Sequence, residues 1–299
     1  GRLAADEQAP TIGKSASALA PPPRADALRQ GRLILVAEDN ETNQKVIVQQ
    51  LALLGFAADV ASDGEQALAR WQSGNYALLL SDLHMPKMDG YELTAAIRGA
   101  ERAAEAENPG GARRIPIIAL TANALRGEAV RCLDAGMDDY QSKPTPLAEL
   151  KAMLEKWLPA VVTVAADSSA SIAVPAAPTV LAVNVSVLAA LVGDDPATIR
   201  EFLTDFRASA NTIAAELATA CAAGDAAEAA ALAHKLKSSA RSVGALALGE
   251  LCAEMEAAGQ IGQSSALTGL WPRFAMEMAT VDAALADLTA RDGKTGSES

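Results

Sequence analysis

Short apolar runs alternate with amphipathic segments of helical length through the first half of the chain. The apolar runs, each long enough for one strand, lie at residues 33–37, 57–61, 77–81, 115–121 and 139–141. The amphipathic segments that follow them lie near residues 42–54, 64–73, 90–106, 125–135 and 146–157. Alternating strands and helices are typical of a parallel sheet with helices on both faces. We therefore predict an α/β doubly wound domain with a five-stranded parallel sheet over residues 31–158.

The second half of the chain shows helical periodicity alone. Four main helices are predicted near residues 195–222, 225–243, 246–258 and 264–290, with a short one at 185–192. Asp195 followed by Pro196 is typical of a helix start, and Gly224 is typical of a helix end. Short loops between long helices indicate antiparallel neighbours. This pattern predicts an all-α four-helix bundle.

Segments rich in Ala, Pro, Ser and Val flank these two regions and separate them. Residues 1–30 and 159–183 have this composition and are predicted to be linkers. The bundle is then expected to occupy residues 184–292, with a tail at 293–299. The chain is therefore predicted to contain two domains, which fits its length of 299 residues.

The charge, the hydropathy and the cysteines of the chain limit its possible partners and its location in the cell. The formal net charge is −12 and the pI is near 4.7. Nucleic-acid binding requires clustered Lys and Arg, so we expect no direct nucleic-acid partner. No run of about 20 apolar residues could span a bilayer, and no secretory leader is visible. Three cysteines without metal-site spacing are typical of a reducing compartment, so we expect a cytoplasmic location.

Reactive side chains follow four of the five predicted strands. They are Glu38 and Asp39 after the first, Asp82 after the third, Thr121 at the end of the fourth, and Lys143 after the fifth. Because the carboxyl ends of parallel strands meet at one edge of a sheet, we expect these side chains to converge. Three carboxylates in one small site require a cation, and oxygen ligands suit Mg²⁺ rather than Zn²⁺. A carboxylate there can act as a nucleophile and form an aspartyl phosphate, with the lysine neutralising charge.

Four motifs in this order resemble those of the receiver domain of two-component response regulators. They are Val36–Asn40 (VAEDN), Ser81–Gly90 (SDLHMPKMDG), Ala119–Ala122 (ALTA) and Ser142–Pro144 (SKP). The resemblance covers about 125 residues and implies a flavodoxin-like fold with strand order 2-1-3-4-5.

The receiver resemblance also implies a role for each residue of the carboxylate cluster. Asp82 is implied to be the phospho-acceptor. Glu38 and Asp39 are implied to hold Mg²⁺ together with Asp82 and the backbone carbonyl of His84. The side chain of His84 is expected only to line the mouth of the site.

The same resemblance implies three further contacts around the phosphoryl group. Thr121 would bind one phosphoryl oxygen, and Lys143 would pair with another. Tyr140 would be the aromatic residue whose rotation with Thr121 accompanies phosphorylation, although simple core packing of Tyr140 is the alternative.

His234 is one of two histidines in the chain and lies in the predicted helix 225–243. At helical spacing the buried stripe of this helix consists of Leu232, Ala233, Leu236, Ala240 and Val243. His234 falls off this stripe, among small residues that include Ser238, so its imidazole is open to a docking partner. Lys237 adds positive charge that would stabilise a phosphoryl group on the ring.

The segment around His234 resembles the histidine-containing phosphotransfer (HPt) domain. That family has the pattern His-x-Leu-Lys, then small residues, then Gly-Ala, and here His234–Lys237 (HKLK) and Gly244–Ala245 match it. The resemblance covers about 105 residues and implies that His234 carries a phosphoryl group in a four-helix bundle. One departure is Ser238, where the family most often has glycine, and it puts affinity in doubt more than activity.

An Asp acceptor and a His acceptor on one chain indicate a phosphorelay. The expected order is from an upstream histidine kinase domain to Asp82, then to His234, then to the receiver of a separate response regulator. The chain resembles the carboxy-terminal part of a hybrid sensor histidine kinase, without the kinase domain. A free-standing relay protein, an interaction scaffold and an Asp-nucleophile phosphatase are the alternatives. The phosphatase is the weakest of these, because His84 stands where haloacid-dehalogenase-like enzymes place a second Asp.

Overall fold

Five parallel strands form one sheet in the order β2-β1-β3-β4-β5. The structure is a computed structural model that describes residues 21–111, 113–122, 126–158 and 182–291. The strands are β1 (Ile34–Ala37), β2 (Ala58–Ala61), β3 (Leu78–Asp82), β4 (Ile117–Thr121) and β5 (Asp139–Ser142). The predicted five-stranded parallel sheet and its order 2-1-3-4-5 are confirmed.

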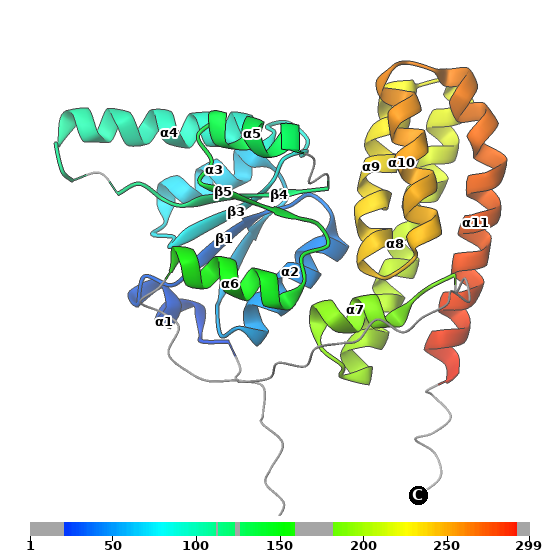
Figure 1. The fold of residues 1–299 in the computed structure, drawn as a ribbon, viewed down its shortest axis with the longest axis horizontal. Coiled ribbons are helices and arrows are strands. Elements are labelled where there is room, and N and C mark those ends of the chain that lie inside the picture. Colours follow the sequence, from blue (N-terminus) through cyan, green and yellow to red (C-terminus); the bar gives the residue numbers. More distant parts are fainter. Residues whose placement is uncertain (1–20, 112, 123–125, 159–181, 292–299) are drawn as a thin grey trace, which may run out of the picture.

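Helices cover both faces of this sheet (Figure 1). One face carries α3 (Gly64–Ser73), α4 (Gly90–Glu107) and α5 (Arg126–Asp134), and the other carries α2 (Glu41–Leu53) and α6 (Leu147–Trp157). Alternate residues of each central strand pack against the helices on opposite faces of the sheet. In β1, Leu35 packs into the same cluster as residues of α3 and α4, whereas Ile34 packs with residues of α2 and α6. Burial on both faces explains why the strands read as continuous apolar runs.

A short helix, α1 (Arg24–Arg29), lies within the segment that the sequence pattern assigned to a linker. Its Ala27 is fully buried in the cluster on the α3 and α4 side of the sheet. The Arg24 guanidinium donates two hydrogen bonds, of 2.7 and 2.6 Å, to the carboxylate of Asp59 in β2. A helix of six residues is too short to show a 3.6-residue period, so hydrophobic spacing could not reveal it.

The second half of the described chain is helical, and the predicted four-helix bundle is confirmed. Its helices are the short α7 (Val185–Val192), then α8 (Pro196–Ala223), α9 (Ala226–Ser242), α10 (Leu246–Gln260) and α11 (Ser264–Arg291). Phe206 and Phe274 are fully buried in its core. Asp195 and Asp225 cap α8 and α9 through their side chains, as expected from their positions. None of the helices that the structure describes combines the length and the hydropathy of a membrane-spanning segment.

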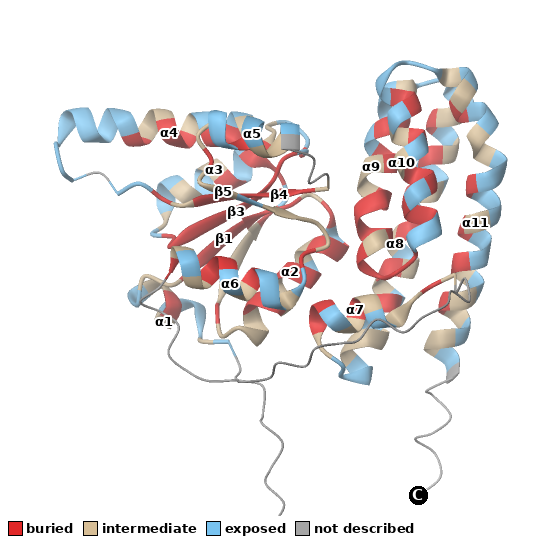
Figure 2. Ribbon diagram, in the orientation of Figure 1, coloured by how far each residue is buried: buried red, intermediate tan, exposed pale blue. Residues whose placement is uncertain are grey.

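The bundle packs against the sheet domain through α2, which contacts α7, α8 and α9. Val46 of α2 is 7% exposed and packs into the core cluster of the bundle rather than onto the sheet. Both α2 and α9 carry buried residues where the two domains approach each other (Figure 2). This contact places the start of α2, next to the carboxyl ends of the strands, beside α9.

Close packing of α9 on α10 sets the position of the bundle helix that carries His234. A Cβ atom at Gly259 would lie 2.5 Å from the Ala226 carbonyl oxygen and 2.8 Å from the Cβ of Ala230. We predict that Gly259→Ala lowers the free energy of unfolding by roughly 1–3 kcal/mol through overpacking. The matched control is Gly269→Ala in α11, where a Cβ meets nothing within 4 Å.

The control should instead stabilise the bundle by about 0.5–1 kcal/mol, because alanine has the higher helix propensity. Urea unfolding followed by circular dichroism measures both changes. Equal effects of the two substitutions would contradict the packing argument.

Candidate functional site

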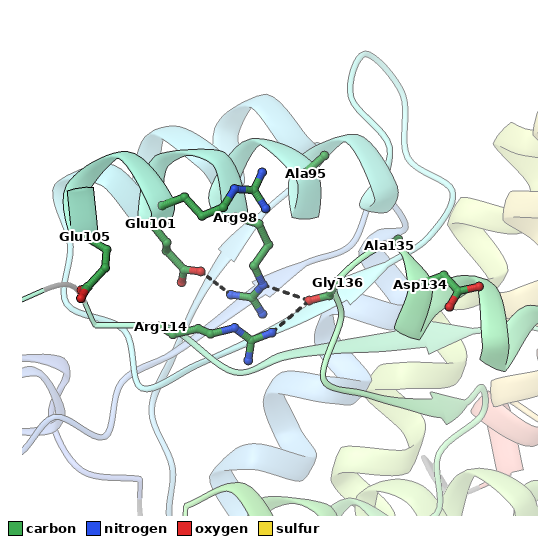
Figure 3. Close-up of a pocket in the computed structure, with 9 residues that line it drawn as sticks. Ala95, Arg98, Glu101, Glu105, Arg114, Asp134, Ala135 and Gly136 are labelled. Atoms are coloured by element: carbon green, nitrogen blue, oxygen red, sulfur yellow. Dashed lines mark hydrogen bonds and ion pairs between the residues drawn. The ribbon is translucent and has the colours of Figure 1, made fainter. Parts of the chain in front are cut away.

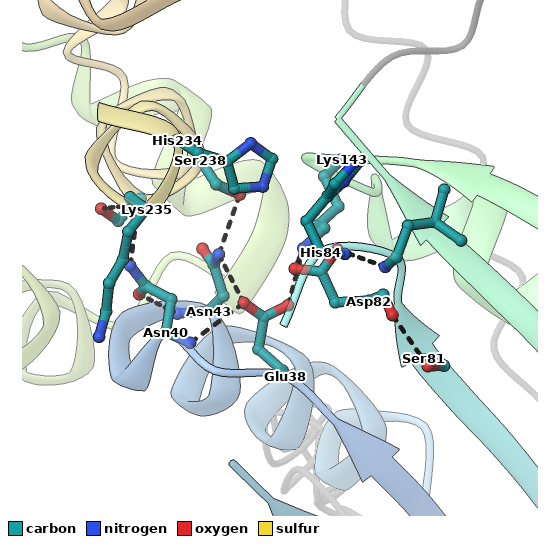
Figure 4. Close-up of polar contacts among 12 residues, drawn as sticks. Glu38, Asn40, Asn43, Ser81, Asp82, His84, Lys143, His234, Lys235 and Ser238 are labelled. Atoms are coloured by element: carbon teal, nitrogen blue, oxygen red, sulfur yellow. Dashed lines mark hydrogen bonds and ion pairs between the residues drawn. The ribbon is translucent and has the colours of Figure 1, made fainter. Parts of the chain in front are cut away.

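The carboxyl ends of β1, β3 and β5 bring together the predicted residues Glu38, Asp82 and Lys143 (Figure 4). Lys143 Nζ lies 2.5 Å from Asp82 Oδ2 and 2.8 Å from Glu38 Oε2, and it donates to both. Glu38 is 1% exposed and Asp82 is 3% exposed, so this ammonium group offsets two buried negative charges. The predicted convergence of these side chains is what the structure shows.

Asp39 completes a cluster of three carboxylates with Glu38 and Asp82. One oxygen from each lies within 4.8 Å of the others. Burial, together with the charge of Asp82, raises the pKa of Glu38 to about 7 and also raises the pKa of Asp39. Burial alone would lower the pKa of Lys143, but the charges of Asp82 and Glu38 outweigh it and raise that pKa. Such mutual repulsion among oxygen donors fits a site for a hard divalent cation such as Mg²⁺.

The Asp82 carboxylate is held in place by the backbone that follows it. Its Oδ1 accepts hydrogen bonds from the backbone N–H groups of Leu83, at 2.7 Å, and His84, at 3.3 Å. The carbonyl of Asp82 lies so close to Gly90 that a Cβ there would be 2.3 Å from the oxygen. Glycine at this position therefore lets the loop after β3 fold tightly around the site.

Thr121 and Tyr140 lie on neighbouring strands near this cluster. Thr121 ends β4 and is 2% exposed, whereas Tyr140 in β5 is 37% exposed. Tyr140 pairs in register with Ala119, two residues before Thr121. The role of Tyr140 as an aromatic switch stays a prediction.

His234 lies on α9 with its side chain 14% exposed. The five residues of the predicted buried stripe, including Leu236 and Ala240, are all buried. The ring Nδ1 lies 2.8 Å from Oε1 of Glu256 on α10. Although burial acts in the opposite direction, hydrogen bonds from His234 and Lys237 lower the pKa of Glu256 to about 2. Since an ionised carboxylate only accepts hydrogen bonds, Nδ1 is the donor in this contact and Nε2 is the ring nitrogen left for a partner.

Glu256 is a site residue that sequence reasoning missed, and it also changes the expected position of Lys237. Lys237 is 8% exposed and donates to the second oxygen of Glu256 rather than standing free beside the imidazole. A signal for Glu256 does exist in α10. Gly249 and Gly259 both leave no room for a side chain against α9, and Glu256 shares their face at helical spacing. A charged residue on a face marked by glycines indicates a specific partner.

The small-residue face beside His234 is covered by α2 of the first domain (Figure 4). The side-chain amide of Asn43 donates one hydrogen bond to Ser238 Oγ, at 2.9 Å, and another to Glu38 Oε1, at 3.0 Å. Asn40, which caps α2, donates a hydrogen bond of 2.9 Å to the backbone carbonyl of Lys235. The open face that we predicted for a docking partner therefore receives a partner from the same chain.

Docking brings His234 to the carboxylate cluster. The rings of His84 and His234 have centroids 4.9 Å apart, and one ligand atom each from Asp82, His84 and His234 lies within 4.8 Å of the others. Burial, and next the charge of His234, lower the pKa of His84. The two predicted acceptors, Asp82 and His234, thus face each other across the interface.

A separate cavity lies between α4 and the turn after α5 (Figure 3). Arg98 and Arg114 donate to the carbonyl oxygen of Gly136 there, and Arg98 also pairs with Glu101 and Asp138. These charges compensate one another and tie α4 to the start of β5. Since no predicted site residue lines this cavity, it is distinct from the carboxylate cluster.

Comparison with known proteins assigns both halves of the chain. Residues 34–155 match the response regulator receiver domain, and residues 201–290 match the Hpt domain. The virulence sensor protein BvgS of Bordetella pertussis is 32% identical over 284 residues, which cover 92% of this chain and 22% of that protein. The hybrid signal transduction protein dokA of Dictyostelium discoideum is 43% identical over 127 residues, 42% of this chain and 7% of that protein. The chain thus spans only a minor part of either relative.

Among solved structures, the receiver domain of sensor histidine kinase PA1611 from Pseudomonas aeruginosa is 42% identical. The match covers 42% of this chain and 97% of the PA1611 receiver chain, with a TM-score of 0.37. The crystal structure of that receiver domain has a magnesium ion coordinated in the active site cleft. The family matches follow the order of the two folds along the chain, sheet domain first and helical bundle second. The chain therefore carries a response regulator receiver domain followed by an Hpt domain, and it is a protein of two-component phosphorelay signalling.

Proposed function

We propose that Asp82 accepts a phosphoryl group from an upstream phosphohistidine and passes it to His234, which hands it to a receiver on a separate response regulator. The observation that carries this proposal is the approach of an Asp82 oxygen to within 4.8 Å of a His234 ring nitrogen. A nucleophile about 3–3.5 Å from phosphorus, plus one P–O bond, places donor and acceptor roughly 5 Å apart. The docked domains therefore bring donor and acceptor within the range that direct transfer needs.

The receiver is proposed to span residues 31–158 and the Hpt domain residues 184–292. The match to BvgS supports a place for both within a hybrid sensor kinase. The cytoplasmic location expected from the sequence stays a prediction.

The carboxylates are proposed to hold Mg²⁺ through Glu38, Asp39 and Asp82, with the backbone carbonyl of His84 as a further ligand. The fit rests on three oxygen donors within 4.8 Å of one another, of which Glu38 has its pKa raised first by burial and then by the charge of Asp82. Bound there, Mg²⁺ would neutralise negative charge on the phosphoryl oxygens. Lys143 already donates to Asp82 and is proposed to bind one phosphoryl oxygen. Thr121, at the end of β4 beside β3, is proposed to bind another.

Transfer to His234 exchanges one bond for another. Nε2 of His234 attacks phosphorus while the bond between phosphorus and the Asp82 oxygen breaks, and the electron pair of that bond returns to the carboxylate. Lys143 stabilises the carboxylate that leaves. Glu256 keeps the proton on Nδ1 and stabilises the positive charge that develops on the imidazole.

We further propose that this transfer runs within one chain. The interface combines the apolar Val46, the hydrogen bonds of Asn40 and Asn43, and an ion pair between Lys45 and Asp205. All of these contacts join α2 to the bundle of the same molecule. Intramolecular docking raises the effective concentration of His234 at Asp82 above that of any other chain.

Labelling tests the order of transfer. The full chain is incubated with Mg²⁺ and a radiolabelled small acyl phosphate, and the wild type should gain acid-labile label on His234. Asp82→Asn should abolish label on His234, because the donor carboxylate is gone. His234→Gln should retain label on Asp82 alone. Label reaching His234 in Asp82→Asn would contradict the order.

Mixing these two variants is the control for transfer within one chain. Asp82 of the His234→Gln chain would have to donate to His234 of the Asp82→Asn chain. We expect this transfer to be at least tenfold slower than in the wild type at micromolar protein, because it lacks the advantage of a shared chain. Equal rates would refute within-chain transfer and leave the relay itself intact.

Docking through α2 is tested at Val46. Val46→Asp places a charge in the apolar contact with the bundle, which costs on the order of 2 kcal/mol or more. Transfer from Asp82 to His234 should therefore slow by about tenfold or more, while phosphorylation of Asp82 by the acyl phosphate persists. The control, Val130→Asp, makes the same change on α5 at a residue that is 56% exposed, and it should leave transfer unchanged. Similar rates in the two variants would argue against the observed docking.

Glu256 is tested as the residue that positions His234. A hydrogen bond to a charged group contributes about 1.5–3 kcal/mol, so Glu256→Ala should slow transfer to His234 by about tenfold or more. Nitrogen-15 NMR should show loss of the Nδ1-protonated tautomer, and Glu256→Gln, which keeps an acceptor oxygen, should restore part of it. Glu254→Ala on the same helix, whose partner is Arg273, is the control. An unchanged tautomer in Glu256→Ala would exclude the positioning role.

A further inference from the structure

Docking assembles a group of side chains that neither domain contains alone. The Asp82 carboxylate comes from the receiver, His84 from the loop after β3, and His234 from the Hpt domain. One ligand atom from each lies within 4.8 Å of the other two. These are the two histidines of the whole chain, so its entire imidazole content is gathered at this interface.

The donor set differs in kind from the carboxylate cluster proposed for Mg²⁺. Two imidazole nitrogens and one carboxylate oxygen suit Zn²⁺ and similar borderline divalent ions, whereas Mg²⁺ prefers oxygen alone. Three protein ligands also leave the fourth position of a tetrahedral ion for water. Ligands of a tetrahedral zinc ion lie about 3.3 Å apart, so the three atoms, now within 4.8 Å of one another, must move closer to bind it. His84 lies on the loop after β3, where its ring packs beside His234 but keeps some contact with solvent, and its movement can shorten its own distances to the other two ligands.

Glu256 gives independent support, because it already occupies the other nitrogen of the His234 ring. Its carboxylate lies 2.8 Å from Nδ1, which leaves Nε2 directed to an incoming ion. A histidine that binds a metal ion usually donates its other ring N–H to a carboxylate or a carbonyl. Glu256 fixes the tautomer and the ring orientation before the ion arrives.

The surrounding charges also admit a divalent cation. The carboxylates at this site, those of Glu38, Asp39, Asp82, Glu128 and Glu256, outnumber its ammonium groups, those of Lys143, Lys235 and Lys237. Lys143 and Lys237 are each engaged with a carboxylate partner, so neither ammonium group competes for the imidazole nitrogens.

We propose that the docked interface binds a divalent transition-metal ion of the zinc class through Asp82, the His84 side chain and Nε2 of His234. The ion links the two domains and holds them in the docked arrangement. It also blocks the relay, because it occupies the same atoms of Asp82 and His234 that exchange the phosphoryl group. This inhibitory part rests on the proposed function, whereas binding of the ion does not.

Cobalt(II) serves as the spectroscopic probe for binding. The full chain in saturating Mg²⁺ is titrated with Co²⁺, and a visible absorption band should appear and then disappear when Zn²⁺ is added. His84→Ala and His234→Gln should each raise the apparent Kd for Co²⁺ by about tenfold or more, because each removes one ligand. Unchanged binding in either variant would overturn the site.

The same titration tests whether the site requires both domains. Val46→Asp removes no ligand but disrupts docking, so it should weaken Co²⁺ binding, and Val130→Asp should not. Equal affinities in these two variants would place the ion within one domain and overturn the proposal.

Inhibition is measured by adding zinc before the radiolabelled acyl phosphate and following the appearance of label on His234. Zinc at a concentration that saturates the cobalt-binding site should slow transfer to His234 by at least tenfold. In His84→Ala this effect should be lost, with each variant compared with its own rate in the absence of zinc. Zinc binding without slower transfer would overturn the inhibitory part. Absence of transfer even without zinc would refute the proposed relay, and the cobalt titration would still decide the metal site.

Discussion

The ammonium group of Lys143 lies between two buried carboxylates, those of Glu38 and Asp82, and donates a hydrogen bond to each. Burying either carboxylate unpaired would cost on the order of several kcal/mol. The three residues follow or end three different strands and are up to 105 positions apart in sequence. Their pairing therefore exists only while β1, β3 and β5 lie parallel in one sheet. Because of this constraint, the state of Asp82 depends on the whole receiver fold rather than on any local segment.

The beginning of α2 extends this network to the second domain. Asn40 caps the helix with its side-chain oxygen and uses its side-chain nitrogen to reach the backbone of Lys235. One turn later, Asn43 shares its amide between Glu38 and Ser238. The residues that follow β1 thus build the edge of the carboxylate cluster and the docking surface at once. Displacing the bundle would remove Ser238 and Ser242 as partners of Asn43 but would leave the pairing of Glu38, Asp82 and Lys143 intact.

The parts of this arrangement that depend on period and strand order were predictable from the sequence. Apolar runs separated by amphipathic helices predict a parallel sheet, and the strand-end rule then brings Glu38, Asp82 and Lys143 together without knowledge of any contact. Helical spacing likewise separated His234 from the buried stripe of its own helix. What could not be predicted depends on packing between elements. Glu256 becomes relevant only because two glycines seat α10 against α9, and no local pattern indicates which helix will meet it.

The docking of α2 on the bundle could not be predicted from the sequence for a further reason. The free energy that its contacts contribute is small. Neutral hydrogen bonds contribute about 1 kcal/mol each, and an exposed ion pair such as Lys45 with Asp205 contributes about 1 kcal/mol or less. Val46 is one apolar side chain whose burial contributes about 1.5–3 kcal/mol. Against the entropy of ordering the two domains, these contacts favour docking without making it permanent. In the proposed relay, His234 must be exposed again to pass its phosphoryl group onward, so a weak interface is what that relay requires. A metal ion bridging Asp82 and His234 would convert this reversible contact into a lasting one.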